Sequence, residues 1–82
     1  MHYVYVLQSS KDHRTYVGCT KDLNRRLKQH NDGAVVSTKS RIPLKLLFLE
    51  EFYTLKEAMQ RERWWKGSSG RKRLKVYFAE KV

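Results

Sequence analysis

The sequence has a single cysteine, Cys19, among its 82 residues. It can therefore form neither an internal disulfide nor a zinc site built from several cysteines. No apolar run approaches the roughly 20 residues of a membrane span, and the run 46–49 has the length of a buried strand. The basic-then-apolar pattern of a signal peptide is also lacking. These absences predict a reduced, intracellular protein in which Cys19 is a small buried hydrophobic residue.

Acidic residues are scarce, with eight against eighteen basic ones, which gives a formal net charge of +10. Apolar residues make up 40%, which is enough for one compact core and argues against a disordered basic tail. The length and the lack of repeats or linkers predict one domain over 1–82. So strong a positive field favours a nucleic-acid partner. The alternative is a basic protein whose charge serves only solubility.

The pattern of apolar and turn-forming residues predicts a small α+β fold. Runs of β-branched and aromatic residues bounded by polar turns predict strands, the first two forming a hairpin. Apolar residues at helical spacing, with capping residues before them, predict helices. The order β-β-α-β-α, followed by a C-terminal helix, implies a three-stranded antiparallel sheet with flanking helices. The expected strands are 2–8, 15–20 and 44–52, the expected helices are 22–32, 55–66 and a short one within 71–82, and 34–41 is a loop.

Capping residues mark the helix limits. Thr20 or Asp22 can cap the start of the first helix. Thr54 and Glu57 match a capping box, in which the threonine bonds a free amide of the first turn and the glutamate reaches back. The glycine- and serine-rich segment 67–70 is expected to end the helix 55–66.

The expected helix 22–32 carries Arg26 and His30, whose i, i+4 spacing places them on one helix face. A planar guanidinium can donate two hydrogen bonds to a phosphate. An imidazole can act as a general base or a phosphate donor near neutral pH. The alternative is that both are solvated surface side chains.

The expected helix 55–66 carries Glu62, the one acid in the strongly basic stretch 61–75. Glu62 falls on the predicted inward stripe of this helix, where an ionised carboxylate is costly unless it is paired or binds a cation. It can be a ligand for a hard cation such as Mg²⁺. The alternatives are a buried Glu–Arg pair or a glutamate at the edge of the stripe. The other predicted inward residues are Leu55, Ala58, Met59 and Trp65.

Tyr5 and Tyr16 lie in the two strands of the expected hairpin and share a face if they pair across it. They can be core aromatics, or their hydroxyls can contact a phosphate or an attacking water. A phenol titrates near 10. A tyrosine acting as a base therefore needs cations that lower its pKa, and Arg26 and a bound metal are the candidates.

Several segments resemble the GIY-YIG nuclease superfamily in order and spacing. Segments 3–5 (Tyr-Val-Tyr) and 16–18 (Tyr-Val-Gly) resemble its paired signature. Residues 20–31 resemble its first helix, and 58–66 resemble the helix that carries its metal-binding glutamate. Segment 67–71 is similar to the C-terminal part of small stand-alone bacterial members, which are similar to the N-terminal nuclease domain of a bacterial excision-repair nuclease.

The sequence departs from the family pattern at a few positions. Tyr3 stands in place of the first glycine of the signature, and Val4 and Val17 stand in place of isoleucines, a swap of similar volume. Cys19 occupies a position where some members carry lysine.

The resemblance implies a metal-dependent phosphodiesterase that acts on DNA. Carried over by position, Tyr16 orients or deprotonates the attacking water, and Tyr5 contacts that water or the scissile phosphate. Arg26 stabilises the charge on the pentacovalent phosphate, and His30 assists as a phosphate contact or proton shuttle. Glu62 holds one Mg²⁺ or Mn²⁺, which neutralises the phosphate and the leaving oxygen.

Basic and polar residues around this site are the expected DNA contacts, although each basic residue alone can be a solvated charge. Phosphate contacts carry no sequence information, so we expect selection by DNA shape, such as a flap, branch or gap, in DNA repair or processing. A cytoplasmic, nucleoid-associated bacterial protein is expected, with a protein partner for targeting and no membrane partner. The predicted contacts are Asn31, Thr38, Lys39, Arg41, Lys66, Arg71 and Lys72.

Two other functions are compatible with the charge. One is a module with a nuclease-like fold that binds DNA or RNA without cutting it. The other is a ribosomal or RNA-associated accessory protein, which leaves the position of Glu62 unexplained. A role at a membrane surface is disfavoured because the helix 55–66 uses its apolar face in the core.

Overall fold

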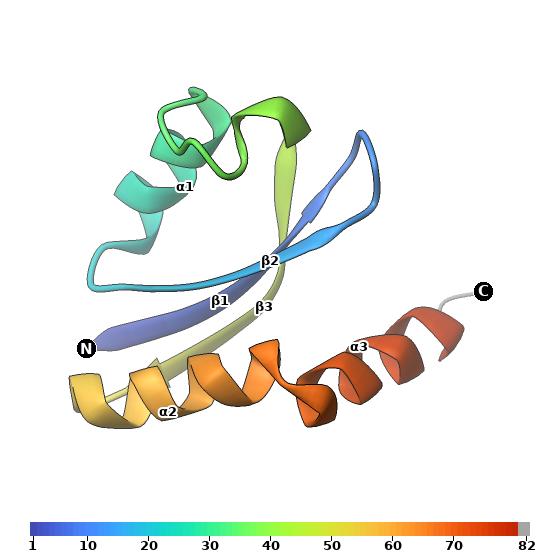
Figure 1. The fold of residues 1–82 in the computed structure, drawn as a ribbon. Helices are drawn as coiled ribbons and strands as arrows, with labels where there is room; N and C mark the ends of the chain where they lie inside the picture. Colours follow the sequence, from blue (N-terminus) through green and yellow to red (C-terminus); the bar gives the residue numbers. More distant parts are fainter. Residues whose placement is uncertain (81–82) are drawn as a thin grey trace.

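The computed structural model of the chain describes residues 1–80. It has a three-stranded antiparallel sheet in the order β2-β1-β3, flanked by three α-helices (Figure 1). This confirms the predicted α+β class and its sheet. A short 3-10 helix at Lys39–Arg41 lies within the expected loop. The other elements are β1 (His2–Ser9), β2 (Thr15–Thr20), α1 (Leu23–Asn31), β3 (Leu44–Phe52), α2 (Leu55–Lys66) and α3 (Ser68–Glu80).

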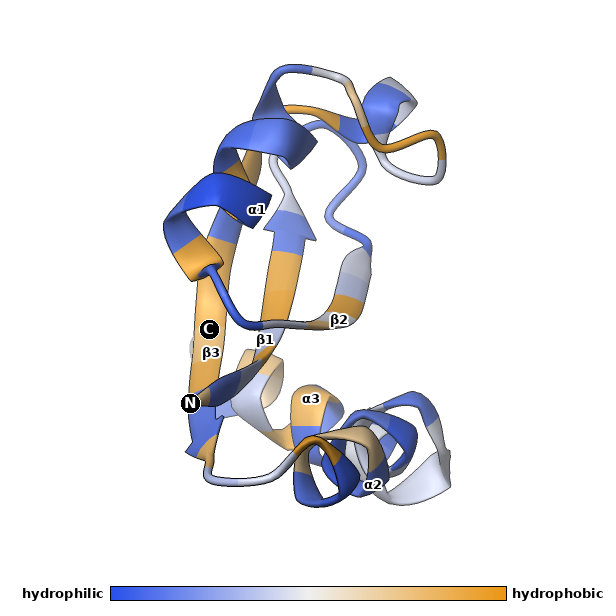
Figure 2. Cartoon of the chain, turned by 90° about the vertical axis from the view of Figure 1, so that its left-hand side faces the viewer, coloured by the Kyte–Doolittle hydropathy of each residue, from blue (hydrophilic) through white to orange (hydrophobic). Residues whose placement is uncertain are grey.

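The central strand β1 is buried on both faces because its side chains alternate between two apolar clusters. Val4 and Val6 face α2 and α3 and pack with Ala58, Trp65 and other residues of that cluster. Tyr5 and the residues that alternate with it face α1. Figure 1 shows α1 on one side of the sheet and α2 with α3 on the other. In Figure 2 the strands are largely hydrophobic, whereas α1 is mostly hydrophilic.

The pairing of β1 with β2 decides which side chains meet above the sheet. Tyr5 pairs with Gly18, and Leu7 pairs with Tyr16. Tyr5 and Tyr16 therefore share a face, as expected, but they are diagonal rather than directly opposite. On the other side of β1, a register shift between Val6 and Leu7 interrupts the pairing with β3.

The rotation of α2 differs from the sequence prediction. Ala58 and Trp65 are buried as expected, whereas Leu55 and Met59 are 51% and 44% exposed. The cause lies at Glu50 on β3, which binds Arg61 and Trp65 and turns that side of the helix toward the sheet. At 100° per residue, the buried face then centres on positions 58, 61 and 65.

The connection between the last two helices also differs from the prediction. Gly67 is the one residue between α2 and α3. The helix α3 begins at Ser68 and is longer than the short helix expected within 71–82, of which 81–82 lie outside the described residues. Gly70 does not end a helix but lies buried in α3, where a Cβ atom would overlap the backbone of Trp65. The close approach of the two helices therefore requires glycine at this position.

The predicted caps form in the structure. The Asp22 carboxylate accepts a hydrogen bond from the Arg25 amide at 3.1 Å, and Thr54 accepts one from the Glu57 amide at 3.2 Å. Cys19 is only partly buried, and it packs against the apolar cluster between the sheet and the helices α2 and α3. Within residues 1–80, no helix combines the length and apolar character needed to cross a membrane.

Candidate active site

Three rings from two strands and one helix meet on the α1 face of the sheet. The centroids of Tyr5 and Tyr16 are 6.5 Å apart, and His30 of α1 lies 5.8 Å from Tyr5 and 5.0 Å from Tyr16. Tyr5 is 1% exposed and His30 is 0% exposed, whereas Tyr16 is partly exposed. Tyr16 is therefore the phenol that a solvent-borne substrate can reach.

Gly18 makes room for this arrangement. It pairs with Tyr5 across the hairpin, and the phenol ring lies over its backbone. A Cβ atom on Gly18 would overlap the ring and hydroxyl of Tyr5. The glycine of the Tyr-Val-Gly segment is thus required by a close contact between side chain and backbone.

Both ring nitrogens of His30 have buried partners. Nε2 lies 3.1 Å from the Tyr5 hydroxyl, and Nδ1 lies 2.8 Å from the Thr38 hydroxyl. The Thr38 hydroxyl donates to the Val35 carbonyl at 3.4 Å. Because that hydroxyl has one hydrogen, its donation to Val35 makes it an acceptor from His30, and on this basis we assign the imidazole proton to Nδ1. This leaves Nε2 as the acceptor for the Tyr5 hydroxyl.

Burial keeps both ends of this hydrogen bond neutral. Burial, and then the positive charge of Arg26, lower the pKa of His30. Burial raises the pKa of Tyr5, against the opposing effect of the hydrogen bond from Arg26. At neutral pH the pair is therefore an uncharged imidazole that accepts from an uncharged phenol.

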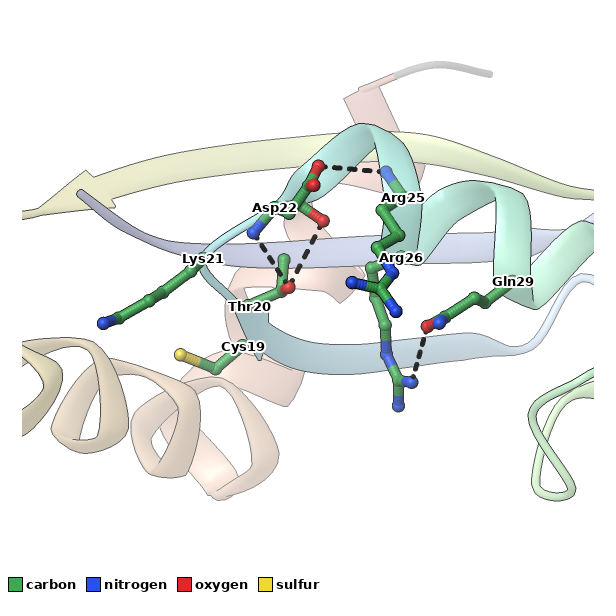
Figure 3. Close-up of a pocket in the computed structure, with 7 residues that line it drawn as sticks. All are labelled: Cys19, Thr20, Lys21, Asp22, Arg25, Arg26 and Gln29. Atoms are coloured by element: carbon green, nitrogen blue, oxygen red, sulfur yellow. Dashed lines mark hydrogen bonds between the residues drawn. The ribbon is translucent and has the colours of Figure 1, made fainter.

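Arg26 connects the buried pair to the surface. Its Nε donates to the Tyr5 hydroxyl at 3.4 Å, and its Nη1 donates to Gln29 Oε1 at 3.2 Å. The hydrogen bond to Tyr5 raises the pKa of Arg26, so the guanidinium stays positively charged. The guanidinium lines an open cleft between α1 and the end of β2 (Figure 3). This arrangement can present a fixed positive charge to an anion.

Glu62 comes from α2 on the opposite side of the sheet. Its side chain is 24% exposed, and its Oε2 accepts from Lys66 Nζ at 3.3 Å. It occupies the edge of the buried stripe, which was one of the predicted alternatives. Burial raises the pKa of the Cys19 thiol, and the Glu62 carboxylate adds to this effect. The same carboxylate is the smallest of the causes that act on the pKa of Tyr5, which it also raises. The carboxylate therefore acts electrostatically on the β2 edge and on the tyrosine cluster.

The donor set at Glu62 is compatible with a hard divalent cation. Its second oxygen, Oε1, has no hydrogen-bond partner within residues 1–80. No group of three or more His, Cys, Asp or Glu side chains within those residues could hold a metal ion. Mg²⁺ suits such a site, since it keeps several waters and takes as few as one or two carboxylates together with substrate phosphate oxygens.

The strongest carboxylate–arginine pair is one that sequence reasoning did not identify. Both oxygens of Glu50 accept from Arg61, at 2.9 and 3.1 Å, and Oε1 also accepts from Trp65 Nε1 at 2.7 Å. Burial opposes ionisation of Glu50, but the hydrogen bonds from Arg61 and Trp65 prevail and lower its pKa. Its signal in the sequence is weak, because Glu50 lies on a strand and Arg61 on the following helix, so no regular spacing links them.

Two of the predicted nucleic-acid contacts, Thr38 and Asn31, have hydrogen-bond partners within the fold. Thr38 is 0% exposed, so its side chain offers no surface to a nucleic acid and serves His30. The side-chain amide of Asn31 donates to the Leu44 carbonyl at 3.2 Å and accepts from the Leu44 amide at 2.7 Å. It ties the end of α1 to the start of β3.

The basic contacts fall into separate groups. Lys66 and Arg71 line a cleft with Tyr16 at the start of β2. Arg41 lies 3.8 Å from Asp12 in a partly exposed ion pair, and Lys39 is exposed in the same 3-10 helix. Lys72 is exposed on α3. The structure thus places two of the five basic candidates beside the tyrosine cluster.

The sheet topology, the paired tyrosines and the arginine and histidine on one helix face define a small nuclease-like α+β domain. Residues 1–77 match the sequence model of the GIY-YIG catalytic domain. The chain belongs to the GIY-YIG family.

Similar proteins occur in several bacteria. The UPF0213 protein YazA of Bacillus subtilis is 44% identical over 81 residues, which are 98% of this chain and 80% of YazA. A UPF0213 protein of Bacillus licheniformis is 46% identical over 81 residues, with 98% and 81% coverage. The solution NMR structure of the UPF0213 protein BH0048 from Bacillus halodurans matches with a TM-score of 0.58 and 35% identity, covering 95% of this chain and 83% of that one.

Proposed function

We propose that this protein is a divalent-metal-dependent DNA endonuclease that hydrolyses phosphodiester bonds. The observation that carries the proposal is the hydrogen bond of 3.4 Å from Arg26 to Tyr5, which fixes a guanidinium beside the partly exposed phenol of Tyr16. Family membership supports the same chemistry, since GIY-YIG domains are generally nuclease domains that use divalent metals.

The proposed roles follow from exposure. Tyr16 orients or deprotonates the attacking water, and Arg26 stabilises the charge that gathers on the pentacovalent phosphate. Tyr5 and His30 are too deeply buried for the direct phosphate contacts expected from the sequence. We give them positioning roles: they hold the Arg26 guanidinium at its hydrogen-bonding distance.

Glu62 is the residue that would hold the metal. A bound Mg²⁺ or Mn²⁺ would neutralise negative charge on the phosphate and on the leaving oxygen. The chain's own contribution is a carboxylate with one oxygen available for coordination and the other paired with Lys66.

The substrate we propose is DNA with a flap, branch or gap, met during repair or processing on the bacterial nucleoid in the cytoplasm. Most basic side chains are exposed, and such contacts bind phosphates whatever the sequence. Choice by DNA shape, or by a protein partner, then supplies the selectivity.

The test is a cleavage assay on supercoiled plasmid and on labelled flap, branched and linear DNA with Mg²⁺, Mn²⁺ or EDTA. We expect metal-dependent cutting that Glu62→Gln and Arg26→Gln abolish. The matched control is Glu51→Gln, an exposed glutamate on β3, which should cut like the wild type. All variants are purified in parallel with the wild type, so that a contaminating nuclease would appear in each.

Unchanged cutting by both Glu62→Gln and Arg26→Gln would refute the assignment of roles. Absence of cutting on every substrate, with salt-sensitive DNA binding intact, would favour the non-catalytic nucleic-acid-binding module instead. Competition of structured RNA against DNA would show whether such a module prefers RNA.

A further inference from the structure

An open cleft lies between the end of β2 and the first turns of α1 (Figure 3). Its volume is about 370 Å³, which is large enough for a phosphate group and part of a sugar. It includes Arg26 and therefore adjoins the candidate active site. The lining residues that matter are Thr20, Lys21, Asp22, Arg25, Arg26 and Gln29.

The charge of this cleft is not balanced within the protein. Three cations, Lys21, Arg25 and Arg26, line it with one acid, Asp22. The Asp22 carboxylate already accepts from the Arg25 amide as the cap of α1. None of the three cations forms an ion pair with any residue of 1–80. Neighbouring cations without a counter-charge favour an anionic ligand.

The side chains are arranged for a ligand that passes through the cleft. Figure 3 shows the Arg25 and Arg26 side chains on the same side of α1, whereas the Lys21 side chain extends away from them. The Arg26 guanidinium is restrained by Gln29 and Tyr5, whereas the Arg25 guanidinium has no hydrogen-bond partner in the described chain. Arg25 therefore keeps its full donor fork for a phosphate.

A second basic cleft lies at the opposite end of β2, where Lys66 and Arg71 join Tyr16. The six residues of β2 span roughly 20 Å. A DNA strand that follows the β2 edge would therefore meet basic side chains at both ends of β2, on either side of the candidate active site.

We propose that the cleft between β2 and α1 binds a backbone phosphate of the DNA strand next to the scissile one, with Arg25 and Lys21 as its ligands. Arg25 donates through its planar fork, and Lys21 contributes a mobile point charge. The inference rests on the proposed function, because it locates this phosphate relative to the one that Arg26 contacts. It is a substrate-binding role for two residues that the sequence did not single out.

The test measures binding of a short fluorescein-labelled DNA single strand by anisotropy over a series of salt concentrations, in EDTA so that no cleavage is needed. For a single strand, each lost phosphate contact reduces the slope of log K against log salt by about 0.7. The double variant Lys21→Gln/Arg25→Gln should therefore lose about 1.4 of this slope. The control Lys45→Gln/Lys56→Gln removes the same charge from β3 and from the outer groove of α2 and should keep the slope.

Equal loss of slope in both double variants would show a general charge effect and overturn the proposal, as would no loss in either. If the wild type cuts DNA, Arg25→Gln should raise KM and leave kcat unchanged, since the contact holds substrate and transition state alike. Cutting with an unaltered salt slope in the cleft variant would refute the subsite and leave the nuclease. A reduced slope without any cutting would retain the subsite and refute the nuclease.

Discussion

The Tyr5 hydroxyl lies 3.1 Å from Nε2 of His30, although the two residues are 25 positions apart in the chain. This contact is the centre of a buried chain of donors and acceptors. Arg26 donates to Tyr5, Tyr5 to His30, His30 to Thr38, and Thr38 to a backbone carbonyl. The orientation of a charged side chain at the surface therefore depends on a hydroxyl in the interior.

The first prediction concerns Thr38. Thr38→Val removes the acceptor of the His30 Nδ1–H and leaves a buried donor unpaired, which costs about 1–3 kcal/mol of unfolding free energy. We expect the histidine to shift toward its other tautomer and cleavage to fall. The ¹⁵N chemical shifts of the imidazole report the tautomer directly.

Thr38→Ser is the control, since it keeps the hydroxyl and should restore both the tautomer and the cleavage rate. Unchanged stability and an unchanged tautomer in Thr38→Val would mean that Thr38 only fills space, because valine has the same shape. In that case the donor and acceptor roles assigned to the hydrogen bonds from Arg26 to Thr38 would be wrong.

The second prediction concerns Gly18. In Gly18→Ala the new methyl group meets the Tyr5 ring, and such overpacking costs about 1–3 kcal/mol. We expect lower stability in urea denaturation and loss of cleavage, because Tyr5 must move away from His30.

Gly67→Ala is the matched control. A Cβ atom there makes ordinary contacts, at 3.5 and 3.6 Å, with carbonyl oxygens of Arg63 and Trp64. Its backbone conformation is extended, with φ −87°, so stability should stay unchanged or rise by up to about 1 kcal/mol. Equal stability of the Gly18 and Gly67 variants would contradict the close packing of Tyr5.

The third prediction concerns pH. Burial lowers the pKa of His30 in the folded chain, whereas an unfolded histidine titrates near 6.5. As the pH falls below about 6.5, the unfolded chain takes up a proton that the folded chain refuses. His30 therefore stabilises the fold fully above this pH, and its contribution is lost as the pH falls toward the folded-state pKa.

Urea denaturation at a series of pH values between about 5 and 8 measures this effect. His30→Gln should flatten the dependence of unfolding free energy on pH, even though the variant is less stable overall. His2→Gln on β1 leaves His30 in place and should keep the wild-type dependence. The prediction fails if the two variants show the same pH profile.

The fourth prediction separates two glutamates. Glu50→Gln weakens the bonds to Arg61 and Trp65. Because this pair is about one-third exposed, solvent screening limits the cost to about 1–2 kcal/mol. Glu62→Gln disrupts only a solvent-screened pair with Lys66 and should change stability by less than about 0.5 kcal/mol.

Activity should show the opposite pattern, since Glu62→Gln loses metal-dependent cleavage and Glu50→Gln retains it below its unfolding transition. Parallel denaturation and cleavage measurements on the two variants make the comparison. If Glu50→Gln abolished cleavage while folded and Glu62→Gln retained it, Glu50 and not Glu62 would be the carboxylate at the reaction centre.

Much of the fold was predictable because its signals are local. The strand limits follow from runs of β-branched and aromatic residues, and the capping residues Asp22 and Thr54 mark helix starts. The shared helix face of Arg26 and His30 follows from their spacing alone. The length of α3 was missed because Gly67 to Gly70 resembles a loop, whereas Gly70 serves a close contact between helices.

The order of strands and helices can be read from the chain because it depends on neighbouring residues, and the excess of positive charge follows from composition. The five candidate residues follow from the resemblance to the GIY-YIG pattern. Which groups face one another becomes known only from the folded molecule. There, Thr38 is buried against His30, and Glu50 pairs with Arg61. These contacts depend on the rotation of α2 and the packing of the 34–41 loop, which are set by residues distant in sequence and leave no local pattern.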